Sequence, residues 1–115
     1  MIVTITGEAN NAKFRGIPGI YLLAPNSING RSHWLQESGS NAIWNFIYYK
    51  GKGVTYSAWG IGSQDDIGKT NTDLTSVDDA AGPQKPSYWR NWNGKDFIKI
   101  YDILVQSGTC ILTPY

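Results

Sequence analysis

The densest group of residues that could recognise a ligand lies in the segment SYWRNWN, residues 87–93. Aromatic rings alternate there with hydrogen-bonding groups, and six residues are candidate ligand contacts: Tyr88, Trp89, Arg90, Asn91, Trp92 and Asn93. A sugar presents an apolar C–H face and a rim of hydroxyls, so its site combines an exposed aromatic plane with amide, carboxylate or guanidinium groups. The segment therefore predicts a carbohydrate-binding surface.

Side-chain alternation divides these candidates between two faces. In an extended strand, Trp89 and Asn91 lie on one face, and Tyr88, Arg90 and Trp92 lie on the other. One face must line the core, which leaves the other to present a ring and hydrogen-bond donors. The pattern does not decide between Trp89 and Trp92 as the exposed ring. The alternative is that all five tryptophans serve as core or half-buried packing residues, because each ring buries a large area on folding.

Five aspartates form a second set of candidates, in and around a polar stretch: Asp65, Asp66, Asp73, Asp78 and Asp79. Ca²⁺ prefers roughly six to eight oxygen ligands, which such a stretch can supply, so these five are candidate calcium ligands. Residues 65–73 lack the alternating acidic spacing and terminal glutamate of a calcium loop, which makes the motif weak. Asp65 and Asp66 are also candidate partners for sugar hydroxyls. The alternative is that the aspartates serve as turn and cap residues. No other cofactor is expected.

Catalysis is not expected. His33, the single histidine, has no nucleophile motif beside it. Cys110, the single cysteine, excludes an intrachain disulfide and is expected to be a small buried side chain. Asp65 and Asp66 face opposite ways on an extended chain and therefore cannot form an acid/base pair by themselves.

The charge balance limits the partners. Ten lysines and arginines face nine aspartates and glutamates, so the chain lacks the basic footprint of a nucleic-acid-binding protein. No apolar run reaches the roughly 18 residues of a membrane-spanning helix, so no membrane insertion is expected. The N-terminal MIVTITGE lacks the basic and long apolar regions of a signal peptide. This favours either a cytoplasmic protein or a domain of a longer chain.

The elements that position these residues are predicted to be strands. Thirteen glycines, five prolines and many aromatic residues punctuate a chain of 115 residues without helical periodicity. This composition predicts one all-β domain over residues 1–115, a compact antiparallel sandwich or small barrel of about eight short strands. Residues 42–49 are apolar on both faces, which predicts a central strand covered on both sides.

Further strands follow from the same alternation. They are predicted at residues 2–6, 19–24, 31–37, 54–61, 73–77, 87–93 and 96–106, with a closing strand at 109–113. Residues 25–30 form a predicted turn cluster in which Asn29-Gly30 is a strong hairpin signal. Phe14 is the expected core anchor of a polar loop. The long polar insertion, residues 63–85, is expected to be functional.

A spaced pattern of aromatic residues and glycines runs through most of the chain: Asn29-Gly30-Arg31, Ala42-Ile43-Trp44, Trp59-Gly60-Ile61-Gly62, Asp78-Asp79-Ala80, Trp89 and Trp92-Asn93-Gly94. The pattern resembles small repeat modules of large extracellular and surface proteins of marine invertebrates and some bacteria. That resemblance implies a non-catalytic binding or adhesion unit within a longer, extracellular chain.

Two functions therefore stay open. The first is a lectin-like, carbohydrate-binding module. The second is a structural or adhesion module whose exposed aromatic residues bind a protein surface or another copy of the chain, since Trp, Tyr and Arg are enriched at interfaces.

Overall fold

The structure is a computed structural model that describes residues 1–7, 12–49, 53, 55–76, 82–86, 88–92 and 94–107. Within these ranges the chain forms β-strands and two short 3-10 helices. In chain order they are β1 (Ile2–Ile5), η2 (Ala12–Phe14), β2 (Gly19–Ile28), β3 (Arg31–Gln36), β4 (Asn41–Tyr49), β5 (Thr55–Ser63), η3 (Gln64–Asp66), β6 (Leu74–Ser76), β7 (Trp89–Trp92), β8 (Phe97–Ile100) and β9 (Ile103–Gln106). The strand predicted at residues 109–113 lies outside the described ranges.

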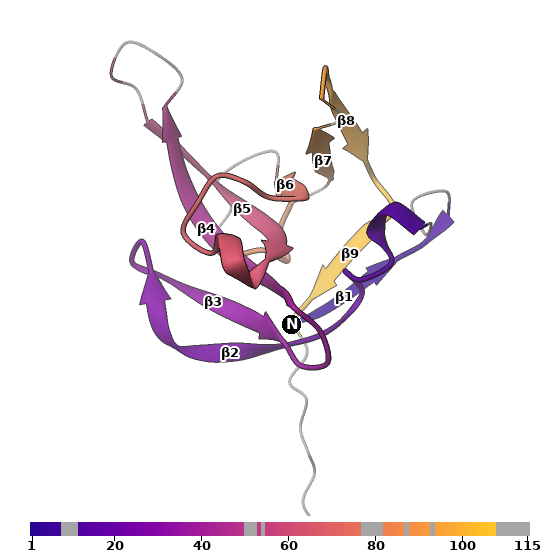
Figure 1. Ribbon diagram of the computed structural model, residues 1–115, viewed down its shortest axis with the longest axis horizontal. Helices are drawn as coiled ribbons and strands as arrows, with labels where there is room; N and C mark the ends of the chain where they lie inside the picture. The colour runs from indigo at the N-terminus through magenta and orange to yellow at the C-terminus, as the bar shows by residue number, and fades with distance from the viewer. Residues whose placement is uncertain are drawn as a thin grey trace, which may run out of the picture.

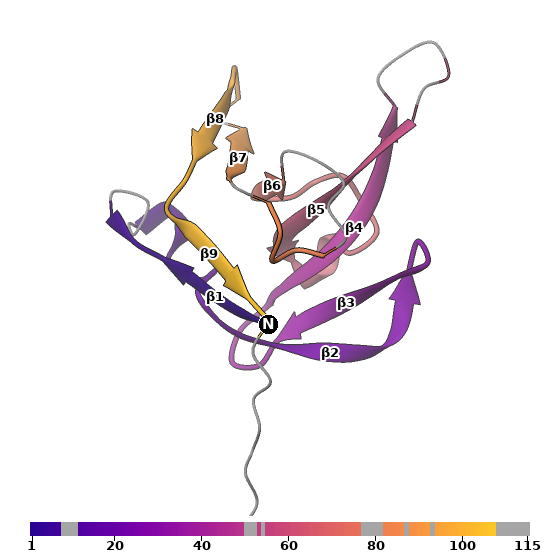
Figure 2. The same cartoon turned by 180° about the vertical axis from the view of Figure 1, so that it is seen from behind.

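All of these strands belong to one antiparallel sheet, in the order β8-β7-β6-β5-β4-β3-β2-β1-β9. Strands β1 to β8 follow one another as an up-and-down meander, and β9 returns to pair with β1. Since β8 leads directly into β9, the same stretch of chain reaches both edges of the sheet, which is nearly closed into a barrel (Figures 1 and 2). The predicted all-β class is confirmed.

The long strand predicted at residues 96–106 is divided. Strict alternation would put Ile100 on the face opposite Ile103 and Val105. In the structure all three pack against the same core cluster, because β8 and β9 are separated by Tyr101 and Asp102. The Asp102 carbonyl accepts a hydrogen bond of 2.9 Å from the Thr6 amide, which ties this link to the end of β1. The break lets both halves face inward while the chain changes partner from β7 to β1.

Strand β2 is longer than predicted. It continues to Ile28, so only Asn29 and Gly30 of the predicted turn cluster form the turn. Both have positive φ, 54° and 75°, as this two-residue hairpin requires. Pro25 is accommodated because the pairing of β2 with β3 shifts between Leu23 and Ser27, and a proline is tolerated at such a bulge.

The central strand β4 is buried on both faces, as predicted. Ile43 belongs to the main core cluster, which also holds Trp59, Trp89 and the predicted anchor Phe14. Trp44 and Phe46 project the other way, into a second cluster with Ala42 and Ala58. Ile67 packs against that second cluster. The Trp44 Nε1–H donates to the Lys69 carbonyl at 3.0 Å, so the polar insertion covers this face of the sheet.

Candidate functional site

Strand β7 separates its candidate residues by face. Trp89 is 1% exposed and Asn91 is 6% exposed, so this face lines the core. Trp92, on the other face, is 52% exposed. The structure thus decides the point that alternation left open. Trp89 is a core residue and offers no ring to a ligand, whereas the half-exposed side chain of Trp92 is accessible from solvent.

Trp92 lines a groove of about 480 Å³ that we call the Trp92 groove. Its walls come from β4, from the segment 70–75, and from the β7–β8 hairpin. The aromatic lining residues are Phe46, Trp92 and Phe97. The polar ones are Thr70, Asn71, Thr72, Asp73, Thr75, Arg90 and Asn91. A few polar groups that converge beside aromatic surface are typical of small-molecule sites.

The aromatic wall is fixed by strand pairing. Trp92 and Phe97 are register partners across β7 and β8, and their ring centroids are 4.9 Å apart at an angle of 57°. The Arg90 guanidinium lies 5.0 Å from the centroid of the Phe97 ring. Tilted ring pairs and cation–π contacts of this kind are mutually stabilising. The ring of Trp92 is therefore supported from one side and open to solvent on the other.

The opposite wall is held by backbone contacts. The Asp73 amide donates to the Ile61 carbonyl at 3.0 Å, and the Asp73 carbonyl accepts 2.7 Å from Asn91 Nδ2. The hydroxyls of Thr72 and Thr75 are 2.8 Å apart. Gly60 makes this approach possible, because a Cβ there would collide with the Thr72 side chain and lie 2.9 Å from the Phe46 ring.

Asp73 also lines the groove. Burial raises its pKa above the usual range, the nearby Asp66 carboxylate raises it further, and Lys13 acts in the opposite direction. No hydrogen bond or ion pair joins the Asp73 carboxylate to another residue in the described part of the chain. Its oxygens are therefore available to accept hydrogen bonds from a ligand.

Arg90 brings a donor. Its Nη2 donates to the Ser76 carbonyl at 3.2 Å, which orients the guanidinium across the sheet. Its Nε–H is buried and has no hydrogen-bond partner among the described residues. A buried donor without an acceptor is unfavourable, so an acceptor that reached it would gain a charge-assisted hydrogen bond.

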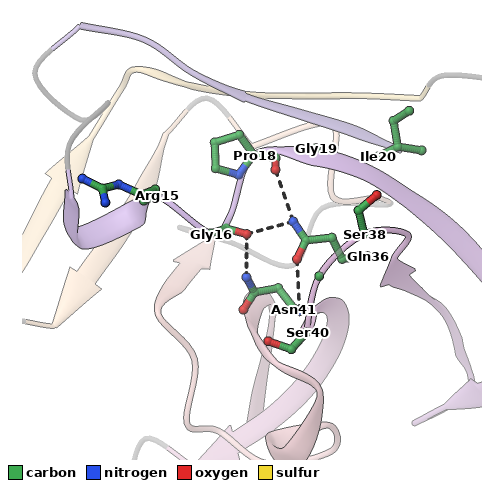
Figure 3. Close-up of a pocket in the computed structure, with 10 residues that line it drawn as sticks. Arg15, Gly16, Pro18, Gly19, Ile20, Gln36, Ser38, Ser40 and Asn41 are labelled. Atoms are coloured by element: carbon green, nitrogen blue, oxygen red, sulfur yellow. Dashed lines mark hydrogen bonds between the residues drawn. The ribbon is translucent and has the colours of Figure 1, made fainter.

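A second cavity, of about 340 Å³, lies where the segment 15–20 meets the β3–β4 turn (Figure 3). Its amides are engaged in internal hydrogen bonds. Gln36 Nε2 donates to the carbonyls of Gly16 and Pro18, at 2.8 and 3.2 Å, and Gln36 Oε1 accepts from the Asn41 amide. Asn41 Nδ2 also donates to the Gly16 carbonyl at 2.8 Å. These bonds anchor a loop, so this cavity is a weaker candidate than the Trp92 groove.

The remaining predicted contacts lie elsewhere. Tyr88 stacks beside Tyr101 with centroids 5.0 Å apart, outside the groove. Asp65 and Asp66 belong to η3 and do not line the groove, contrary to their predicted role as hydroxyl partners. Ser63 Oγ caps η3 by accepting from the Asp65 amide, and Asp66 pairs with Lys69 at 3.7 Å. Asn93, Asp78, Asp79 and Cys110 are outside the described residues.

Three of the five predicted calcium ligands, Asp65, Asp66 and Asp73, lie within the described chain. There, no group of three or more histidine, cysteine, aspartate or glutamate side chains is placed to hold a metal ion. Of the three that the structure describes, Asp73 lines the groove. His33 is buried, and its Nδ1 lacks a partner among the described residues.

Sequence reasoning missed the contributions of Phe46, Phe97, Thr70 and Asn71. Phe46 and Phe97 are 51 positions apart in the sequence and meet only through the order of the strands. The one available signal was the outward face shared by Phe97 and Trp92 once an Asn93-Gly94 turn is assumed.

Comparisons of the chain with protein-family models, curated proteins and solved structures find no match. In the described residues, no helix is long and apolar enough to cross a membrane.

Proposed function

We propose that this protein is a non-catalytic carbohydrate-binding module that holds its ligand in the Trp92 groove. One observation carries the proposal. The half-exposed ring of Trp92 shares a groove with a carboxylate, Asp73, and a guanidinium donor, Arg90, that still have hydrogen-bonding capacity. An exposed aromatic ring suits the apolar C–H face of a sugar, and polar groups that can still form hydrogen bonds suit its hydroxyls.

Each side chain has a distinct role in this proposal. The Trp92 ring packs against the C–H face of one sugar, and Phe97 supports the ring from behind. The Asp73 carboxylate accepts hydrogen bonds from hydroxyls, and the Arg90 guanidinium donates to a hydroxyl or ring oxygen. Asn91 is assigned a positioning role, because its side chain is buried and its Nδ2 donates to the Asp73 carbonyl.

A binding role is favoured over glycoside hydrolysis by the composition of the groove. Hydrolysis by the common mechanisms uses two carboxyl groups on either side of the scissile bond. Among the described residues that line the groove, Asp73 is the one carboxylate. The resemblance to extracellular repeat modules supports placing this unit at a cell surface, as part of a longer chain.

A glycan array with purified protein tests the proposal. We expect a defined set of sugars to bind, and Trp92→Ala to abolish binding while the circular dichroism spectrum stays that of wild type. Leu23→Ala is the matched control, since Leu23 is 64% exposed and lies on β2, outside the groove. A parallel array with a chelator tests calcium. A folded protein that binds no sugar would exclude the proposal.

The second candidate is a protein-interaction module, and a specific surface favours it. Exposed apolar side chains lie on the outer face of three neighbouring strands, with Ile20 and Leu22 on β2 and Leu104 on β9. Strand β1 lies between them, where Ile2 is paired with Ile20. Scattered apolar residues are normal on a surface, but neighbouring ones mark interaction sites. Sedimentation over a range of concentrations, with Leu22→Gln and Leu104→Gln, separates self-association at this face from sugar binding.

A further inference from the structure

The outward face of the β7–β8 hairpin continues beyond the Trp92 groove as three cross-strand pairs. We call this surface the β7–β8 ladder: Trp92 with Phe97, Arg90 with Lys99, and Tyr88 with Tyr101. The two outer pairs are aromatic, with centroid separations of 4.9 and 5.0 Å. Same-face residues on a strand are about 7 Å apart, so the ladder is longer than the groove that ends at Arg90.

The middle pair places two cationic residues opposite each other in the strand register. Arg90 and Lys99 are register partners, and each lies diagonally over a ring of a neighbouring pair. The Arg90 guanidinium is 5.0 Å from the Phe97 centroid, and Lys99 Nζ is 5.5 Å from the Tyr88 centroid. Neither forms an ion pair with a carboxylate in the described parts of the chain. The two charged groups thus lie toward opposite ends of the ladder, where each attracts an anionic group of a bound ligand.

We infer that the Trp92 groove extends along the β7–β8 ladder and binds an acidic oligosaccharide, whose carboxylate or sulfate groups pair with Arg90 and Lys99. This inference rests on the proposed function and narrows it to negatively charged chains of more than one sugar. One sugar stacks on Trp92, and a later sugar of the same chain reaches Tyr88 and Tyr101.

Asp73 determines which side of the ligand faces each wall of the groove. Asp73 lies on the wall formed by segment 70–75, whereas Arg90 and Lys99 lie on the hairpin wall. An anionic group is repelled from the first wall and attracted to the second. Neutral hydroxyls of the same chain therefore face Asp73, and the charged group faces the ladder.

Titration calorimetry with a matched pair of ligands tests the inference. The ligands are an oligogalacturonate and its methyl ester, which has the same sugars without the charges. A sulfated oligosaccharide separates sulfate from carboxylate recognition, and a short oligothymidylate tests nucleic acid. The proteins are wild type, Lys99→Gln and Arg15→Gln. Arg15 lines the second cavity, so Arg15→Gln lowers the net charge equally without touching the ladder.

We expect the acid, or the sulfated chain, to bind at least about tenfold more tightly than the methyl ester, as one charge-assisted contact implies. Lys99→Gln should remove most of that preference, and Arg15→Gln should leave it unchanged. Equal binding of acid and ester, lost in Trp92→Ala, would overturn the inference and leave the proposed function intact. Failure of every sugar to bind the folded protein would overturn both. Tighter binding of oligothymidylate, lost in Lys99→Gln, would assign the ladder to nucleic acid instead.

Discussion

Asn91 Nδ2 donates a hydrogen bond of 2.7 Å to the main-chain carbonyl of Asp73, 18 positions earlier in the sequence. The bond connects the inner face of β7 to the segment that forms the opposite wall of the Trp92 groove. A buried amide thereby sets the distance between the aromatic and the carboxylate sides of the site. Loss of this one contact is expected to affect both stability and binding.

Asn91→Ala tests that connection. Asn91 is 6% exposed, so its loss leaves the Asp73 carbonyl with a missing donor in a buried setting. We expect the free energy of unfolding to fall by about 1–3 kcal/mol in urea titrations. Sugar affinity should fall as well, although Asn91 is assigned no contact with the ligand. Asn71→Ala is the control for stability, because its 3.5 Å bond to Asp66 is long and exposed, and its effect should stay within about 0.5 kcal/mol.

Substitutions of the two β7 tryptophans should have opposite effects. Trp89 is 1% exposed, so Trp89→Ala should destabilise the protein by about 3–5 kcal/mol. Trp92 is 52% exposed, so Trp92→Ala should cost about 1 kcal/mol of stability while sugar affinity drops by at least about tenfold. Thermal unfolding and calorimetry measure the two quantities. Similar loss of stability in both variants would contradict the assignment of Trp92 to a surface site.

The pKa of Asp73 makes stability depend on pH. It is raised by burial and by Asp66, so the folded protein retains a proton at pH values where the unfolded chain has released it. The stabilising contribution is thus present below the unfolded pKa, about 3.9, and is lost as the pH rises through the folded pKa. Asp73→Asn has no carboxyl group at this position, so its stability does not fall with rising pH for this reason. Its stability relative to wild type should therefore increase as the pH rises from about 3 to about 7.

Urea titrations across that pH range measure the effect of Asp73→Asn. Asn71→Ala, which removes no titrating group from the same segment, serves as the control. A difference between Asp73→Asn and wild type that stays constant with pH would show that Asp73 titrates alike in the folded and unfolded chains.

Gly60→Ala tests the close approach of segment 70–75 to β5. The added Cβ would collide with Thr72 and lie 2.9 Å from the Phe46 ring, so the segment must move away. We expect a loss of about 1–3 kcal/mol in stability, together with weaker sugar binding. Gly16→Ala is the matched control, since the nearest atom to its Cβ, Asn41 Nδ2, is at an ordinary 3.5 Å. Equal effects of the two substitutions would refute the role given to Gly60.

Local patterns predicted much of the fold. The two apolar faces of residues 42–49 indicated a strand covered on both sides, and Ile43 and Trp44 do pack in different clusters. Asn29-Gly30 predicted its hairpin turn for a conformational reason, the positive φ of both residues. The division at Tyr101 and Asp102 was missed because continuous alternation fits residues 96–106 in isolation. The alternation of inward and outward side chains changes at this point only because β9 must pair with β1 to close the sheet.

The candidate site was predicted less completely. Alternation placed Arg90 and Trp92 on one face, but it contains no information on which face turns inward. That choice depends on the order of the strands, as does the arrival of Phe46 and Asp73 beside Trp92. Asp65 and Asp66 lie in η3, outside the groove. This could not be predicted, because the sequence of a polar stretch does not show which of its carboxylates reach the strands around Trp92.

The pairing of β1 with β9 has a consequence for the order in which the protein folds. Ile2 and Gln106 are register partners from opposite ends of the described chain, whereas β2 to β5 pair as successive hairpins. Contacts between distant residues form slowly, because the loop entropy must be lost before they are gained. During synthesis, β1 therefore emerges first and keeps one edge unpaired until the ribosome has released β9. For that interval an apolar strand edge is open to other chains, so β9 also protects the nascent protein from aggregation.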